Sequence, residues 1–161
     1  MDTDDFDPFV ARLDYPMFVV TAAHGDSRAG CLVGFATQAS IDPPRFLICL
    51  STKNHTFDIA RSSGVLAVHA LRRDQHELAE LFGATTGDEV DKFTRCRWSA
   101  GPDGVPLLDD CESRFVGRIL QRFDFGDHVG HLLEPTGVDK AGAGRVLTFQ
   151  KVRDLSPGHQ A

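Results

Sequence analysis

The chain has 161 residues, of which 42% are hydrophobic and 25% charged, which suits one globular domain with a real core. Its formal net charge of -6 disfavours a nucleic-acid partner, because a phosphate backbone selects for a basic face. The apolar runs are too short to span a bilayer, and no Lys/Arg cluster accompanies an amphipathic helix, so no membrane partner is expected. The acidic start, MDTDD, is unlike a basic targeting peptide and favours the cytoplasm.

We expect a single domain over residues 1–161, with its core at about 15–150 and a loose tail at 156–161. An N-terminal helix is predicted within residues 1–14, because one face of residues 2–13 collects the apolar side chains Phe6, Phe9, Val10 and Leu13. Pro16 then ends this helix.

Seven later segments are rich in apolar and β-branched residues and predict strands. They are residues 17–22, 30–38, 45–50, 65–71, 113–123, 129–133 and 145–149. The Asp42-Pro43-Pro44 sequence predicts an extended turn, because a residue before proline is pushed away from helical geometry. A tight turn is predicted at Gly126-Asp127.

Short helices are predicted between some of these strands. One covers Thr56–Ser63, with Gly64 as a left-handed C-cap. Another covers Gln75–Phe82, where Asp74 and Glu77 form a capping box and Gly83 ends the helix. Residues 84–110 are rich in Gly, Asp and Pro and predict irregular structure. Strands and helices do not alternate regularly enough for a doubly wound fold, so we expect a mainly β chain, a small barrel with short helices.

Several common sites are not supported by the sequence. It contains no G-x-G-x-x-G after a strand, no phosphate-binding P-loop and no G-x-S-x-G elbow. His128 and His131 are three residues apart in a predicted strand, so they point to opposite faces and make a poor metal pair. The four cysteines include no C-x-x-C pair, which favours buried or free thiols over a disulfide frame or a zinc site.

The segment from Gly30 to Phe57 is the strongest candidate site. Its first part mixes small residues, which let a planar ring approach the backbone, with Thr37, Gln38 and Ser40. Its second part, Ser51–Thr56, offers hydroxyls, an amide and a lysine just before a predicted helix, which is a suitable place for a phosphate. An ordinary helix cap beside a solvated lysine explains the second part equally well.

The order of these motifs resembles the flavin-reductase-like family, the short-chain NAD(P)H:flavin oxidoreductases. The resemblance runs from about Tyr15 to Phe149. It rests on Val19-Val20-Thr21, Gly30, Phe35–Ser40, Asp42-Pro43-Pro44, Lys53–Thr56, Ser63-Gly64-Val65, Gln75–Phe82, Lys92-Phe93 and Gly126-Asp127-His128. Family members often carry hydroxyl or amide side chains just after the glycine, where this chain has Cys31-Leu32-Val33-Gly34.

The resemblance implies an FMN-binding split β-barrel of about six strands that reduces FMN or FAD with NADH or NADPH. It assigns the flavin ring and ribityl chain to Phe35, Ala36, Thr37, Gln38 and Ser40, and the phosphate to Ser51, Lys53, Asn54, His55 and Thr56. His128, beside Asp127, would lie near the ring where the nicotinamide stacks. No metal is expected.

The resemblance also implies a homodimer, and a monooxygenase as one candidate acceptor of the reduced flavin. Two other functions stay open at this point, because one fold hosts many functions. One is a flavin-binding electron carrier or a reductase of another acceptor. The other is a non-catalytic interaction protein that has kept the barrel.

Overall fold

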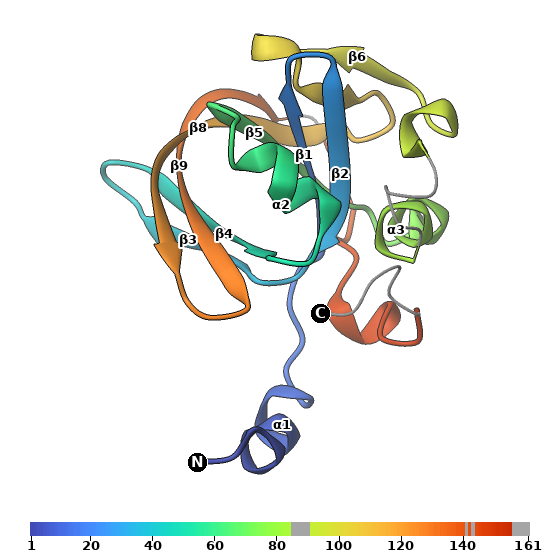
Figure 1. The fold of residues 1–161 in the computed structure, drawn as a ribbon. Coiled ribbons are helices and arrows are strands. Elements are labelled where there is room, and N and C mark those ends of the chain that lie inside the picture. The colour runs from blue at the N-terminus through green and yellow to red at the C-terminus, as the bar shows by residue number, and fades with distance from the viewer. Residues whose placement is uncertain (85–90, 141, 143, 156–161) are drawn as a thin grey trace.

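The computed structural model describes residues 1–84, 91–140, 142 and 144–155. Its body is a seven-stranded antiparallel sheet in the order β2-β1-β5-β8-β9-β4-β3, which curls into a barrel (Figure 1). The strands are β1 (Phe18–His24), β2 (Ser27–Val33), β3 (Ala36–Ser40), β4 (Arg45–Ser51), β5 (Val65–Ala70), β8 (Ser113–Asp124) and β9 (His128–Lys140). The expected mainly β split barrel is confirmed, with seven strands in its sheet where about six were expected.

Besides the strands, the described residues form three helices and three short 3₁₀ turns. The helices are α1 (Thr3–Val10), α2 (His55–Ala60) and α3 (His76–Gly83), and the 3₁₀ turns are η1 (Lys92–Thr94), η2 (Pro102–Gly104) and η3 (Phe149–Lys151). Helix α2 packs against β1 and β2 inside the curl of the sheet, whereas α3 lies on the outer side of β2 (Figure 1). Within the described residues, no helix combines the length and apolarity that crossing a membrane requires.

Alternation along the strands divides the apolar residues between two cores. Val20 and Ala22 of β1 pack inside the barrel with Ile48 and Leu66. Val19, the residue before Val20, points to the opposite face and joins the second core, which lies under α3 and the C-terminal segment and contains Met17, Leu71, Phe82, Phe93 and Leu147. The first strand is therefore buried on both faces.

The predicted strand at 145–149 is wrong. This segment crosses the ends of two strands instead of following one: Leu147 N–H donates to the Leu71 carbonyl at 2.8 Å, and Met17 N–H donates to the Leu147 carbonyl at 2.9 Å. Only isolated bridges form, Pro16 with Thr148 and Arg72 with Val146. The crossing brings the C-terminal segment back to the start of β1.

The predicted single strand at 30–38 is broken. Strand β2 ends at Val33 and β3 begins at Ala36, so Gly34 and Phe35 form a link between them. A Cβ on Gly34 would lie 2.5 Å from Cε2 of Tyr15, so only glycine lets the Tyr15 ring pack against this link.

The predicted helix caps also need correction. Helix α2 begins one residue earlier than expected, at His55, and its C-cap is the right-handed Arg61, so Gly64 does not serve as a left-handed cap. Helix α3 begins at His76, one residue later than expected, so Gln75 and not Asp74 occupies the N-cap position, and no side chain caps the helix. Asp74 forms an ion pair with Arg72 at 3.1 Å.

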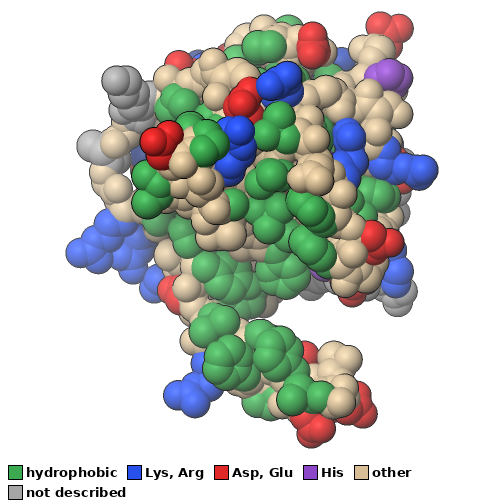
Figure 2. Space-filling model, turned by 90° about the vertical axis from the view of Figure 1, so that its left-hand side faces the viewer, with side chains coloured by type: hydrophobic (Ala, Val, Ile, Leu, Met, Phe, Trp, Pro, Cys, Tyr) green, Lys and Arg blue, Asp and Glu red, His purple; other side chains and the backbone are tan. Residues whose placement is uncertain are grey.

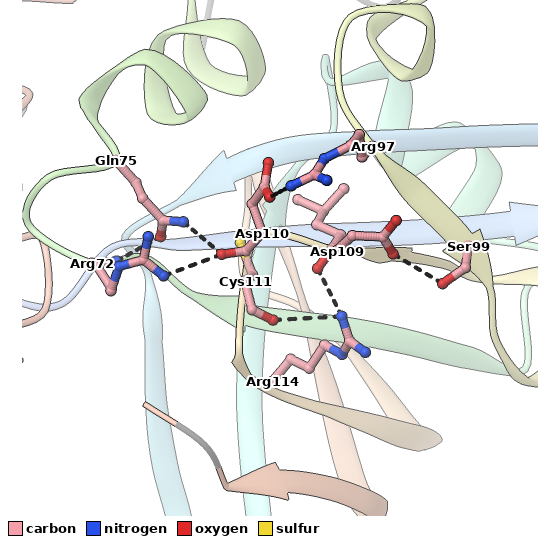
Figure 3. A network of polar contacts seen from close by, with 9 residues as sticks. Arg72, Gln75, Arg97, Ser99, Asp109, Asp110, Cys111 and Arg114 are labelled. Carbon is pink, nitrogen blue, oxygen red and sulfur yellow. Dashed lines mark hydrogen bonds and ion pairs between the residues drawn. The ribbon is translucent and has the colours of Figure 1, made fainter. Parts of the chain in front are cut away.

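The region predicted to be irregular, residues 84–110, contains the small sheet of β6 (Trp98–Ala100) and β7 (Pro106–Leu108), while residues 85–90 lie outside the described part. A network of hydrogen bonds and ion pairs connects the segment after β7 to the residues just before α3 (Figure 3). Gln75 Nε2 donates to the Asp110 carbonyl at 2.8 Å, and Arg114 Nη1 donates to the Leu108 carbonyl at 2.7 Å. The predicted loose tail, 156–161, also lies outside the described residues.

Candidate functional site

The site builds up around a pocket of about 280 Å³ at the link between β2 and β3. The end of β2 and the link supply Cys31 to Phe35, and the end of β4 with the loop and the first residue of α2 supplies Cys49, Leu50, Ser51, Asn54 and His55. The other walls come from α3, η1, the start of β9 and the C-terminal segment, through Phe82, Gly83, Lys92, His128, Phe149, Val152, Arg153 and Leu155, together with Tyr15 and Met17. Segments from the whole length of the chain therefore meet at this one place.

The loop after β4 is ordered by local hydrogen bonds. Asn54 Oδ1 accepts a hydrogen bond from Thr56 N–H at 2.8 Å and so caps α2. Lys53 N–H donates to Ser51 Oγ at 3.3 Å. These bonds hold a hydroxyl, an amide and the start of a helix together at the edge of the pocket.

The same loop is tied to the turn between β8 and β9. Both N–H and Oγ1 of Thr52 donate to the Asp127 carbonyl, at 2.9 and 3.2 Å. Ser51 is also the register partner of His128 across the β4–β9 ladder. Two candidate regions that are more than 70 residues apart in sequence are thus neighbours in the fold.

His128 lies in the pocket wall with its ring held on two sides. Its Nδ1 is 2.8 Å from Oδ1 of Asp127, and its ring centroid lies 4.9 Å from that of Phe35 at an interplanar angle of 45°. The hydrogen bond to His128 lowers the pKa of Asp127, so this carboxylate stays an acceptor. Nδ1 of His128 therefore carries the donated proton, which leaves Nε2 for a ligand.

The Cys31 thiol is fully enclosed at the inner end of the site. Burial raises the pKa of Cys31, although side-chain hydrogen bonds from Thr56 and Asn54 oppose that effect. The thiol is therefore protonated at neutral pH and acts as a small apolar group. All four cysteines are free.

The structure brings five of the sequence-predicted site residues to the pocket and leaves the others around or away from it. Those that line it are Phe35, Ser51, Asn54, His55 and His128. Lys53 is exposed on the same loop, Thr56 is buried beneath it, and Ala36 packs against the barrel core. Asp127 reaches the site through His128.

The remaining three predicted residues lie elsewhere on β3. Thr37 and Gln38 are exposed, and Gln38 and Ser40 line a second groove of about 340 Å³ with Phe18, Phe46 and Phe115. This follows from the break at Gly34 and Phe35, because the chain turns away from the pocket before it reaches Thr37.

Sequence reasoning missed a wall of the pocket. Tyr15 and Phe149 stack with ring centroids 4.9 Å apart and an interplanar angle of 15°. They meet because Phe149 N–H donates to the Tyr15 carbonyl at 2.9 Å. No local motif marks either residue, so only long-range pairing could have revealed them. Among the described residues, no group of three or more His, Cys, Asp or Glu side chains could hold a metal ion.

Comparisons with known proteins agree with this architecture. The family model "Flavin reductase like domain" matches residues 10–155. One curated relative, FMN reductase (NADH) RutF from Variovorax paradoxus (strain S110), is 28% identical over 145 residues, covering 90% of this chain and 80% of its own. Because the family model covers almost the whole chain, the protein belongs to the flavin-reductase-like family.

Two solved structures show the same fold. The NADH:FAD oxidoreductase SgcE6 of Streptomyces globisporus superposes with a TM-score of 0.83 at 24% identity, covering 92% of this chain and 90% of its own. Nitrilotriacetate monooxygenase component B from Mycobacterium thermoresistibile gives a TM-score of 0.80 at 22% identity, covering 92% and 82%. At sequence identities of 24% and 22%, this structural similarity is evidence for the fold alone.

Proposed function

We propose that this protein is a flavin reductase that transfers a hydride from a nicotinamide nucleotide to FMN or FAD in the pocket beside Phe35. One observation carries the proposal: the loop with the Ser51 hydroxyl and the Asn54 amide lines the same pocket as the Phe35 and His128 rings, which are in contact with each other. The names of the relatives favour NADH over NADPH and allow either flavin.

The residues around the pocket fit a flavin. A flat ring needs apolar and aromatic walls, which Phe35, Leu50 and Tyr15 provide. A phosphate needs donors and positive charge, which the loop from Ser51 to Thr56 offers through its hydroxyls, the Asn54 amide and Lys53. When bound, the flavin itself supplies the hydride-accepting chemistry.

The chain's own contribution is to bind, orient and exclude water. His128 lines the pocket, and Asp127 holds its imidazole through Nδ1, so Nε2 is the ring nitrogen left for a ligand. Because the side chain of Asp127 is 73% exposed, it acts through His128. We assign His128 to the nicotinamide side of the site and Asp127 as its positioning residue.

Titration of the purified protein with FMN, followed by fluorescence quenching, tests the location of the site. The Phe35→Ala and Ser51→Val variants should weaken FMN binding, because both side chains line the pocket. Thr37→Ala is the matched control, because Thr37 is exposed on β3 outside the pocket, and it should bind FMN like the wild type. If Thr37→Ala weakened FMN binding and the two pocket variants did not, the flavin site would have to lie on the other face of β3.

The His128→Gln variant tests the assignment of the nicotinamide side. It should keep FMN affinity and lose turnover with NADH, while His24→Gln, an exposed substitution in β1, should change neither. Unchanged turnover in His128→Gln would refute the assignment. A protein that binds flavin but is not reduced by NADH or NADPH would instead be an electron carrier or a reductase of another acceptor.

We also propose that the protein is a homodimer. Helix α1 stands away from the barrel (Figure 1) and carries Phe6 and Phe9, which are 51% and 64% exposed. Figure 2 shows an apolar surface on the projecting helix, with further apolar surface on the body above it. Exposed apolar patches of this kind mark interaction sites. Light scattering should therefore give a dimer, and a Phe6→Ser, Phe9→Ser double variant should shift it toward monomer; a wild-type monomer would contradict the proposal.

The acceptor of the reduced flavin is proposed to be a partner monooxygenase, on the strength of the component B structure. The four free cysteines favour a reducing compartment, in agreement with a cytoplasmic location. Substrate oxidation by a monooxygenase supplied with flavin only through this protein and NADH would test the pairing, and its absence would argue for another acceptor.

A further inference from the structure

The pocket wall contains a buried lysine that belongs neither to the loop at Ser51–Thr56 nor to the Asp127-His128 pair. Lys92, at the start of η1, is only 6% exposed and contributes to the wall of the pocket. Its Nζ donates to the Gly30 carbonyl at 3.0 Å and to the Phe82 carbonyl at 3.0 Å. Two of the three ammonium protons are thus committed to the protein.

Part of this arrangement is structural. Gly30 lies in β2, which is the edge strand of the sheet, and Phe82 is in the last turn of α3. Lys92 therefore provides a donor for one edge carbonyl and one helix-end carbonyl, both of which need partners when buried. A neutral amide could donate to the same two carbonyls at a smaller desolvation cost.

Among the residues that the structure describes, no carboxylate forms an ion pair with the Lys92 ammonium. The ionisable group that faces it is the Cys31 thiol. Burial raises the pKa of that thiol, so it carries no negative charge at neutral pH. Burial also lowers the pKa of Lys92. The two hydrogen bonds that its ammonium donates to the Gly30 and Phe82 carbonyls are interactions that favour the charged form.

We propose that Lys92 makes the pocket selective for the reduced, negatively charged form of the flavin over the oxidised form. This inference rests on the proposed flavin site. Hydride transfer moves two electrons and one proton from the nicotinamide to the flavin ring, so the flavin gains negative charge while the nicotinamide becomes cationic. Lys92 forms no bond and gives up no proton in this step; its fixed positive charge lies in a water-poor wall, where it stabilises the charge that the flavin gains.

The expected effect can be stated as a ratio of affinities. A single opposite charge a short distance away shifts a charge-forming equilibrium by on the order of tenfold. Removal of the Lys92 charge should therefore raise the Kd of reduced FMN, relative to that of oxidised FMN, by about tenfold. For a two-electron couple, this ratio equals a fall of about 30 mV in the midpoint potential of the bound flavin.

The test measures Kd for oxidised and for anaerobically reduced FMN, and the midpoint potential of the bound flavin, in three variants. Lys92→Met removes the charge and should give the tenfold change in ratio. Lys92→Arg keeps the charge and should keep the ratio. Arg73→Met removes an exposed positive charge outside the pocket and should leave both affinities unchanged.

Each outcome decides between the two roles of Lys92. If Lys92→Met binds both forms of FMN equally more weakly, with an unchanged potential, the lysine is structural and the proposal fails. If Lys92→Met does not fold, Lys92→Gln keeps a donor for the two carbonyls and serves as the neutral variant. A wild type that binds no flavin would overturn the proposed function itself, whereas a wild type that binds and reduces FMN but shows no ratio change in the neutral variants would overturn only this inference.

Discussion

Acid should destabilise the fold through one buried histidine. His69 of β5 is fully buried and joins three strands: Nδ1 donates to the Val19 carbonyl at 2.9 Å, and Nε2 accepts from Leu108 N–H at 3.0 Å. Both ring nitrogens are used by the neutral imidazole, and a proton on Nε2 would break the bond to Leu108. Burial lowers the pKa of His69 to about 4, from an ordinary value of 6.5.

The sign and size of the effect follow from proton linkage. Between pH 6.5 and about 4, His69 is protonated in the unfolded chain but stays neutral in the folded protein. The free energy of unfolding therefore falls as the pH falls through this range. The full difference of about 2.5 pH units, at about 1.36 kcal/mol each, amounts to about 3 kcal/mol. About 2 kcal/mol of it is lost between pH 6.5 and pH 5, where most carboxylates are still ionised.

Urea unfolding at pH 7, 6 and 5 measures this loss. A His69→Gln variant, which cannot titrate, should be less stable at pH 7 and should show a much smaller fall between pH 7 and pH 5. Burial lowers the pKa of His131 as well, so a residual slope of the same sign should remain. If His69→Gln keeps the full wild-type slope, the buried neutral imidazole is not the cause.

Two further predictions concern the frame of the pocket. Asn54→Ala, measured without flavin, should cost about 1 kcal/mol of unfolding free energy because α2 loses its cap, while Asn54→Asp should keep it; equal losses would show that the cap contributes nothing. Gly34→Ala should cost about 1–3 kcal/mol and weaken FMN binding, because its Cβ would meet the Tyr15 ring at 2.5 Å. Gly137→Ala, whose Cβ would meet nothing within 4 Å, is the control, and equal effects of both substitutions would refute the steric argument.

Local patterns predicted the elements better than their ends. The strands at 45–50, 65–71 and 113–123 follow from continuous apolar or β-branched runs, and the structure places β4, β5 and β8 there within a residue. The cap of α3 was wrong because the helix begins one residue later than the capping pattern indicates, which leaves Gln75 and not Asp74 at the N-cap position. The strand at 145–149 was wrong because two different neighbours share its hydrogen bonds.

The candidate site could be predicted where it depends on local sequence, but not where it depends on contacts between segments far apart in the chain. The loop at Ser51–Thr56 and the Asp127-His128 pair were marked by their residue types, and the β4–β9 register unites them. The break between β2 and β3 at Gly34 and Phe35 was missed, and the close approach of the Tyr15 ring to Gly34 is a long-range contact that the local sequence does not show. Lys92 could be recognised only as part of a motif, because its position in the wall depends on β2 and α3 together.

The most direct test of the central claim is an anaerobic stopped-flow mixing of the purified protein and FMN with NADH. If the protein is a flavin reductase, the absorbance of oxidised flavin should be lost in proportion to the NADH added, at a rate far above that of free FMN and NADH. The loss should slow in Phe35→Ala but not in Thr37→Ala. Flavin that stays oxidised with both NADH and NADPH would contradict the account.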